Sequence, residues 1–217
     1  MLSVPKMREI LDSYGLNSSE VLCEQIRSYI ELLLKWNKRI SLTSVLDPEE
    51  IVKYHFAESF LATKAVDALS GRLADVGSGA GFPGLALKIY LPGLQVSLIE
   101  ANSKKCVFLA EVIRSLRLEG VAVVHTRFEG IEDNFDIVSS RALGSIPKLL
   151  VWAQSVTLPS AHALLWLGPK GIREASASPR WTWNQPYAIP ATTGRFILSG
   201  RPNHQIIYTR STWNKFT

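Results

Sequence analysis

The sequence predicts an α/β fold in which a helical segment precedes a mostly parallel β-sheet. From residue 73 onwards, short apolar runs alternate with longer stretches of helical periodicity, as they do in βαβ units. In the first 70 residues, apolar side chains instead recur at intervals of three and four, which is the pattern of amphipathic helices. We therefore divide the 217 residues into an N-terminal helical extension (1–70) and an α/β domain (71–217).

The helical extension contains three predicted helices. A short one is expected over residues 5–14, and a longer one over residues 18–39, where Ser18-Ser19 provides an N-terminal cap. The sequence Asp47-Pro48-Glu49-Glu50 has the composition of the cap and first turn of a third helix.

The α/β domain begins with four strands, each followed by a helix or a loop. The strands are predicted at 73–76, 95–99, 121–125 and 137–140, and the helices from about residue 84, at 104–118 and at 147–156. Three further apolar runs follow at 163–167, 196–198 and 205–209. We expect the last two to form an antiparallel pair at the edge of the sheet, and residues 168–195 to be irregular.

The overall composition is that of one compact globular protein. Hydrophobic residues make up 47% and charged residues 20%, and no apolar run approaches the roughly 20 residues that cross a bilayer. The first residues do not resemble an export signal, so we expect a cytoplasmic protein without a membrane partner, acting as a monomer. Cys23 and Cys106 lie far apart without a metal-binding spacing, so we expect neither a disulfide framework nor a metal site.

The net charge of +5 is concentrated in the last third of the chain. Residues 146–217 contain eight Lys or Arg against a single acid, Glu174, and five of the six tryptophans. Such a segment suits a nucleic-acid surface, because cations neutralise phosphates and aromatic rings stack on bases. A solvated basic face above core tryptophans explains the composition equally well.

A glycine-rich loop follows the first predicted strand. It reads Asp75-Val76-Gly77-Ser78-Gly79-Ala80-Gly81-Phe82-Pro83-Gly84. Glycines at a strand-to-helix turn permit positive φ and let the backbone approach a ligand at the carboxyl edge of the sheet. We therefore predict a nucleotide-like ligand, although the same glycines also match the dinucleotide fingerprint.

Two features favour S-adenosylmethionine over a nicotinamide cofactor. The negative charge of Asp75 suits a ligand that carries an ammonium and a sulfonium, but opposes a pyrophosphate at the helix N-terminus. The glycine order Gly77, Gly79, Gly81 also places Phe82 where the dinucleotide pattern, counted from Gly77, has a glycine. Glu100, at the end of the second strand, can bind the ribose hydroxyls of either cofactor.

The glycine block, together with Lys35-Trp36-Asn37, Leu42-Thr43-Ser44 and Ser140-Arg141-Ala142, resembles a known family over roughly residues 20–150. This family is the bacterial 16S ribosomal RNA guanine-N7 methyltransferases, also called glucose-inhibited division protein B. The resemblance implies a Rossmann-like class I methyltransferase fold and S-adenosylmethionine as cofactor. It also implies 16S ribosomal RNA, or a precursor of the small ribosomal subunit, as substrate and 7-methylguanosine as product.

The resemblance also implies site residues. The family's cofactor contacts fall on Gly77, Phe82, Phe128, Glu129 and Arg141, beside the Asp75, Gly79 and Glu100 indicated by the loop itself. The family's Arg-His-x-x-Asp-Ser is Tyr54-His55-Phe56-Ala57-Glu58-Ser59 here, which keeps the histidine and changes two neighbours. Beyond residue 150 the similarity is limited to Lys170-Gly171.

The predicted chemistry needs orientation more than proton transfer. Guanine N7 carries an unprotonated lone pair, so no general base is expected. Arg141 and His55 are the predicted positioning residues at the reacting centre. We expect Lys170, Arg180, Arg195 and Arg201 to hold the RNA backbone.

Two alternatives remain open on the sequence. One is a class I methyltransferase that acts on a small molecule or a protein, and the other is a nicotinamide-dependent oxidoreductase of the Rossmann type.

Overall fold

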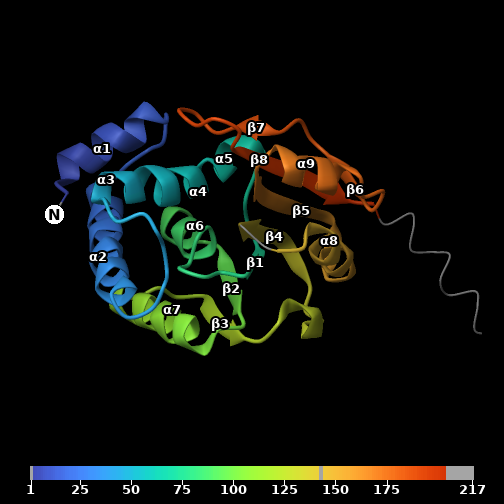
Figure 1. The fold of residues 1–217 in the computed structure, drawn as a ribbon, viewed down its shortest axis with the longest axis horizontal. Coiled ribbons are helices and arrows are strands. Elements are labelled where there is room, and N and C mark those ends of the chain that lie inside the picture. The colour runs from blue at the N-terminus through green and yellow to red at the C-terminus, as the bar shows by residue number, and fades with distance from the viewer. Residues whose placement is uncertain (1, 142–143, 204–217) are drawn as a thin grey trace, which may run out of the picture.

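A mostly parallel sheet lies at the centre of the structure, a computed structural model that describes residues 2–141 and 144–203 (Figure 1). The strand order is β3-β2-β1-β4-β5-β8-β6, and β7 pairs with β8 beside this path. The parallel strands are β1 (Arg72–Val76), β2 (Gln95–Glu100), β3 (Val121–His125), β4 (Phe135–Arg141) and β5 (Thr157–Leu167). The antiparallel strands are β6 (Trp181–Trp183), β7 (Tyr187–Ala188) and β8 (Phe196–Pro202). The predicted fold class is confirmed.

The strand order places a ligand-binding edge at the end of β1. This strand lies between β2 and β4, so Val76 is in register with both Ile99 and Ser140. The chain leaves β1 toward β2 on one side and reaches β4 on the other, which makes this edge a topological switch point. The segments after Val76, Glu100 and Ser140 therefore emerge side by side.

Helices cover both faces of the sheet. The N-terminal α1 (Val4–Ser13) and α2 (Glu20–Asn37) share one hydrophobic cluster with α6 (Gly84–Tyr90), α7 (Ser103–Ser115) and one face of the sheet. A second cluster joins the other face to α8 (Ile146–Ser155) and α9 (Pro169–Ser176), which lie on the opposite side of the sheet from α2 in Figure 1. No helix within the described ranges is long and apolar enough to span a membrane.

The predicted helix starts are confirmed at three positions. The side chains of Ser3, Ser19 and Asp47 each accept a hydrogen bond from a backbone N–H three residues ahead. Asp47 caps a bent helical segment that runs through α3 (Pro48–Ile51), the π-helix η1 (Val52–Ala57), α4 (Glu58–Phe60) and α5 (Ala62–Ala65). This segment brings His55 and Glu58 to the edge of the sheet.

The prediction for the C-terminal part was wrong in one respect. Residues 168–195 are not wholly irregular, because Pro169 opens α9 and the segment also supplies β6 and β7. Strand β8 pairs with β5, β6 and β7, while the run at 205–209 that we expected beside it lies outside the described residues, so that pairing stays a prediction. Strands of two or three residues are too short to show an apolar periodicity in the sequence.

The C-terminal tryptophans are part of the hydrophobic core. Trp152, Trp166 and Trp181 are buried, and each indole N–H donates to a backbone carbonyl. Trp183 is partly buried and donates to the carbonyl of Ala175, while Trp213 lies outside the described residues. For the four described tryptophans, the interpretation as core residues is confirmed.

Candidate active site

The glycine loop joins β1 to α6 in a left-handed conformation. Gly77, Gly79 and Gly81 have φ values of 71°, 56° and 86°, which residues other than glycine rarely adopt. A Cβ on Gly81 would collide with the hydroxyl of Tyr29, so the core fixes this glycine. A Cβ on Gly79 would meet only the carbonyl of Gly77, at 3.7 Å. The space above Gly79 is therefore open, as a loop that accepts a ligand requires.

The side chain of Asp75 forms hydrogen bonds beneath the glycine loop. Its side chain is fully buried, with Oδ2 accepting from the Gly84 amide at 3.1 Å and Oδ1 from the Ser139 hydroxyl at 2.9 Å. Burial raises the pKa of Asp75 to about 6, against the opposing effect of these hydrogen bonds. Both oxygens are engaged beneath the loop, so the charge of Asp75 lies under the loop backbone, and its contact with the cofactor stays a prediction.

A first cavity of about 250 Å³ lies between the loop and the ends of β2 and β3. Gly77, Glu100, Phe128 and Glu129 line it together, so the structure brings these four predicted residues into one place. Phe128 and Glu129 belong to the short 3₁₀ helix η2 (Phe128–Gly130).

Glu100 connects this cavity to the loop. Its Oε2 accepts from the Gly79 amide at 2.9 Å and its Oε1 from the Asn102 amide at 2.8 Å. The carboxylate is nearly buried. Each oxygen retains a lone pair that can accept a further donor, such as a ribose hydroxyl.

A second cavity, also of about 250 Å³, lies on the other side of Gly77. His55, Gly79, Phe82 and Arg141 line it. The Phe82 ring stacks on the imidazole of His55 with the ring centroids 4.7 Å apart. Because Gly77 lines both cavities, a ligand that passes over the loop reaches from Glu100 and Phe128 to His55 and Arg141.

His55 is held as a neutral ring. Its Nε2 lies 2.8 Å from the Thr43 hydroxyl, while its buried Nδ1 has no hydrogen-bond partner among the described residues. Burial, and then the nearby positive charge of Arg141, lower the pKa of His55 to about 4. An imidazole in this state is a weak proton acceptor, which agrees with a chemistry that needs none.

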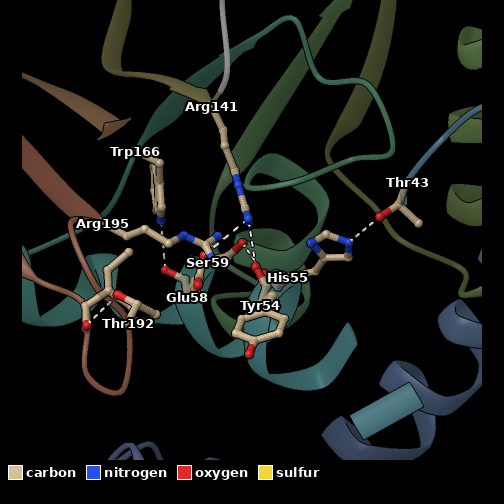
Figure 2. Close-up of polar contacts among 10 residues, drawn as sticks. Thr43, Tyr54, His55, Glu58, Ser59, Arg141, Trp166, Thr192 and Arg195 are labelled. Carbon is tan, nitrogen blue, oxygen red and sulfur yellow. Dashed lines mark hydrogen bonds and ion pairs between the residues drawn. The ribbon is translucent and has the colours of Figure 1, made fainter. Parts of the chain in front are cut away.

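Arg141 and Arg195 converge on one carboxylate, as Figure 2 shows. Arg141 Nη2 lies 3.2 Å and Arg195 Nη2 2.5 Å from Glu58 Oε2. Arg141 Nη1 also donates to the carbonyl of Tyr54 at 2.8 Å. Burial raises the pKa of Glu58 against the pull of the two arginines, and lowers the pKa of Arg141. The prediction of site residues missed Glu58, although a lone acid in the apolar stretch 56–62 is a signal that could have indicated it.

The four predicted RNA-binding cations do not share one surface, which corrects their grouping. Arg195 and Lys170 lie at the ligand-binding edge, because Phe196 is paired with Leu167 at the carboxyl end of β5 and Gly168 follows that strand. Strand β8 runs antiparallel to β5, so Arg201 lies at the opposite edge, paired with Thr182.

Arg180 is also at that opposite edge, where it donates to Gln154 near the end of α8. The sequence could not separate the two pairs, because the direction of β8 is fixed by tertiary pairing.

The fold is that of the class I methyltransferases. The ribosomal protein L11 methylase of Lactobacillus delbrueckii subsp. bulgaricus superposes with a TM-score of 0.58 at 17% identity, covering 70% of this chain and 79% of that one. A mutant of MtNAS in complex with S-adenosylmethionine superposes with a TM-score of 0.55 at 14% identity, covering 90% and 76%. At these identities the likeness shows the fold alone.

Sequence relatives identify the family. The model of the family GidB, rRNA small subunit methyltransferase G, matches residues 22–184. The ribosomal RNA small subunit methyltransferase G of Paracidovorax citrulli (strain AAC00-1) is 35% identical, over 78% of this chain and 74% of that protein. The chain belongs to the rRNA small subunit methyltransferase G family. The resemblance stated from the sequence is thereby confirmed, and S-adenosylmethionine is the methyl donor.

The residues present fit this donor. The loop leaves open space above Gly79, and the carboxylate of Glu100 and the ring of Phe128 lie on one side of Gly77 with the cavity of His55 and Arg141 on the other. When bound, S-adenosylmethionine supplies a methyl group on a positively charged sulfur.

Proposed function

We propose that the chain methylates N7 of a guanine in 16S ribosomal RNA and produces 7-methylguanosine. The observation that carries the proposal is the meeting of two cavities at Gly77, one suited to the donor and the other lined by His55 and Arg141. Membership of the rRNA small subunit methyltransferase G family supports ribosomal RNA, free or in a precursor of the small subunit, as the substrate. This substrate implies a cytoplasmic enzyme. One chain carries both cavities, so the proposal requires only a monomer.

The second cavity suits a nucleophile that has no proton to lose. The N7 lone pair of guanine would form the new bond to the methyl carbon as the bond from that carbon to sulfur breaks, with S-adenosylhomocysteine as the leaving group, and this transfer needs a fixed orientation of both partners. His55 is neutral because its pKa is lowered to about 4, and Arg141 is held by Glu58 and by the carbonyl of Tyr54. In the proposal, both residues orient the guanine and neither removes a proton.

The remaining residues have distinct proposed roles. Glu100 accepts from the ribose hydroxyls of the donor, and Phe128 and Glu129 contact its adenine. Gly77 and Gly79 present backbone to the donor, and Phe82 supports the ring of His55. Lys170 and Arg195 are the proposed RNA-binding cations, because both lie at the edge that carries the cavities. Arg180 and Arg201 are left out of the proposed site.

The proposal is tested by reconstitution. The purified protein is incubated with isotopically labelled S-adenosylmethionine and either 16S RNA or small ribosomal subunits, both taken from cells without the gene. The RNA is then digested to nucleosides and analysed by mass spectrometry. We expect label in 7-methylguanosine with at least one of the two substrates. Label in a different nucleoside, or none with either substrate, would overturn the proposal.

A further inference from the structure

A third cavity, of about 390 Å³, adjoins the second one at the ligand-binding edge. Arg141 lines both cavities, and the lining of the third also includes Glu58, Trp166, Gly168 and Arg195. Neither the donor nor the guanine of the proposed reaction occupies it, because those ligands are assigned to the two cavities that meet at Gly77.

The charged groups of this cavity are arranged for an anion. Two guanidinium groups share the single carboxylate of Glu58, so one positive charge remains uncompensated within the cluster. The side chain of Glu58 is only 1% exposed, whereas those of Arg141 and Arg195 are 18% and 38% exposed. The Glu58 carboxylate therefore lies beneath the two guanidinium groups, and an incoming ligand would contact the guanidinium groups first.

Both guanidinium groups are pre-oriented and keep free donors. Arg195 lies over the ring of Tyr54, 5.5 Å from its centroid, and Arg141 donates to the carbonyl of the same residue. A guanidinium has five N–H donors in one plane, and these contacts use only part of them. Such a planar fork matches the geometry of two phosphate oxygens.

The amino end of α9 adds positive potential at the same place. Its N-cap, Gly168, lines the cavity, has no side chain to cap the helix, and is followed by a first turn without an acidic residue. The first backbone N–H groups of a helix have no partner within the helix, and the helix dipole is positive at this end. Lys170, in this first turn, has an exposed ammonium group that is paired with Glu174 on the same helix, at 3.8 Å.

We propose that this cavity is a subsite for a backbone phosphate of the RNA, beside the guanine to be methylated, with Arg141 and Arg195 as its ligands. The inference rests on the proposed function, since it assumes an RNA substrate. Glu58 holds the two arginines in place before the RNA arrives, and phosphate oxygens then accept from their free N–H groups. Arg141, shared between the two cavities, links the seating of the phosphate to the orientation of the guanine.

The test measures RNA affinity as a function of salt concentration for the full chain. Each phosphate contact contributes to the slope of log K against log salt, so we expect Arg195→Ala to lower the slope by about 1 and to weaken binding about tenfold. The matched control is Arg114→Ala, since Arg114 is also paired with a glutamate, Glu111, but lies on α7 away from the cavities. We expect this control to change neither quantity. The affinity for S-adenosylhomocysteine should be the same in both variants.

A second variant separates a phosphate subsite from a merely structural cluster. Glu58→Gln keeps the size of the side chain and one oxygen, which can accept from both arginines as Oε2 does in the wild type, so the arginines stay in place while the negative charge beneath them is removed. A phosphate subsite predicts RNA binding at least as tight as in the wild type, whereas a structural cluster or a base held by the carboxylate predicts weaker binding. Weaker binding by Glu58→Gln, in a protein that still unfolds cooperatively, would overturn the inference. So would an Arg195→Ala protein indistinguishable from Arg114→Ala.

The wild type distinguishes this failure from a failure of the proposed function. If the wild-type protein methylates guanine N7 and Arg195→Ala behaves as Arg114→Ala does, only the phosphate subsite is wrong. If the wild type transfers no methyl group to 16S RNA or to the subunit, the proposed function itself fails.

Discussion

The carboxylate of Asp75 accepts a hydrogen bond from the Gly84 amide at 3.1 Å and so ties the end of β1 to the start of α6. The whole glycine loop is enclosed between these two residues. A Cβ on Gly84 would lie 2.7 Å from the Cβ of Asp75, so the contact also requires a glycine at this position. In the proposed site the position of the donor over the loop depends on this pair, although neither residue lines the two cavities that meet at Gly77.

Replacing Asp75 by alanine or by asparagine separates the effect of its two hydrogen bonds from the effect of its negative charge. Asp75→Ala removes both hydrogen bonds, and we expect it to weaken binding of S-adenosylhomocysteine at least tenfold and to abolish methyl transfer, while RNA binding stays nearly intact. Asp75→Asn can keep both contacts, with its amide donating to Ser139, so we expect a much smaller loss. Calorimetric titration measures both affinities. A fully active Asp75→Ala protein would contradict the assignment of the loop.

The raised pKa of Asp75 predicts a dependence of stability on pH. The folded pKa of about 6 exceeds the ordinary value of 3.8, so the folded state holds its proton longer than the unfolded chain as the pH rises. As the pH rises from about 4 to about 6, the free energy of unfolding therefore falls by up to about 3 kcal/mol because of Asp75. Urea unfolding of wild type and Asp75→Asn over this range isolates the effect. We expect the free energy of unfolding of Asp75→Asn to increase relative to that of the wild type as the pH rises. A difference in free energy that does not change with pH would contradict the raised pKa of Asp75.

The lowered pKa of His55 predicts that this residue contributes no pH dependence to catalysis near neutral pH. Its pKa is lowered to about 4, so its protonation does not change between about pH 6 and about pH 8. We expect kcat/KM for the RNA substrate to be constant from about pH 7 to about pH 8 in the wild type, above the pH at which Asp75 titrates. His55→Asn should lower kcat/KM about tenfold, because the guanine loses an orienting partner, without introducing a slope. An inflection near the ordinary histidine pKa that disappears in His55→Asn would show that the ring titrates during catalysis.

Arg141→Ala tests the positioning of the substrate. We expect kcat/KM for RNA to fall about a hundredfold, because both the guanine cavity and the neighbouring cavity lose a shared cation. The midpoint of thermal unfolding should change little, since Glu58 keeps Arg195 as a partner. Arg141→Lys keeps the charge but not the planar fork, so we expect an intermediate loss. A kcat/KM within twofold of the wild type would remove Arg141 from the site.

The sequence was sufficient for the parallel part of the fold and for most of the residues that line the proposed donor cavity. Local periodicity predicted β1 to β4, and the glycine block predicted the loop, because these signals lie within a few consecutive residues. The partners of Asp75 could not be predicted, since Ser139 lies 64 positions away and is brought close only by the pairing of β1 with β4. The same holds for the contact between Glu58 and Arg195, which lie 137 positions apart.

Methylation of guanine N7 in 16S ribosomal RNA is tested by comparing cells with and without the gene. Mass spectrometry of nucleosides from purified 16S RNA measures 7-methylguanosine in both strains. We predict that one 7-methylguanosine per 16S molecule is lost without the gene, and that it returns when the wild-type gene is supplied but not when Asp75→Ala is supplied. An unchanged content of 7-methylguanosine in cells without the gene would show that this protein does not methylate guanine N7 of 16S RNA.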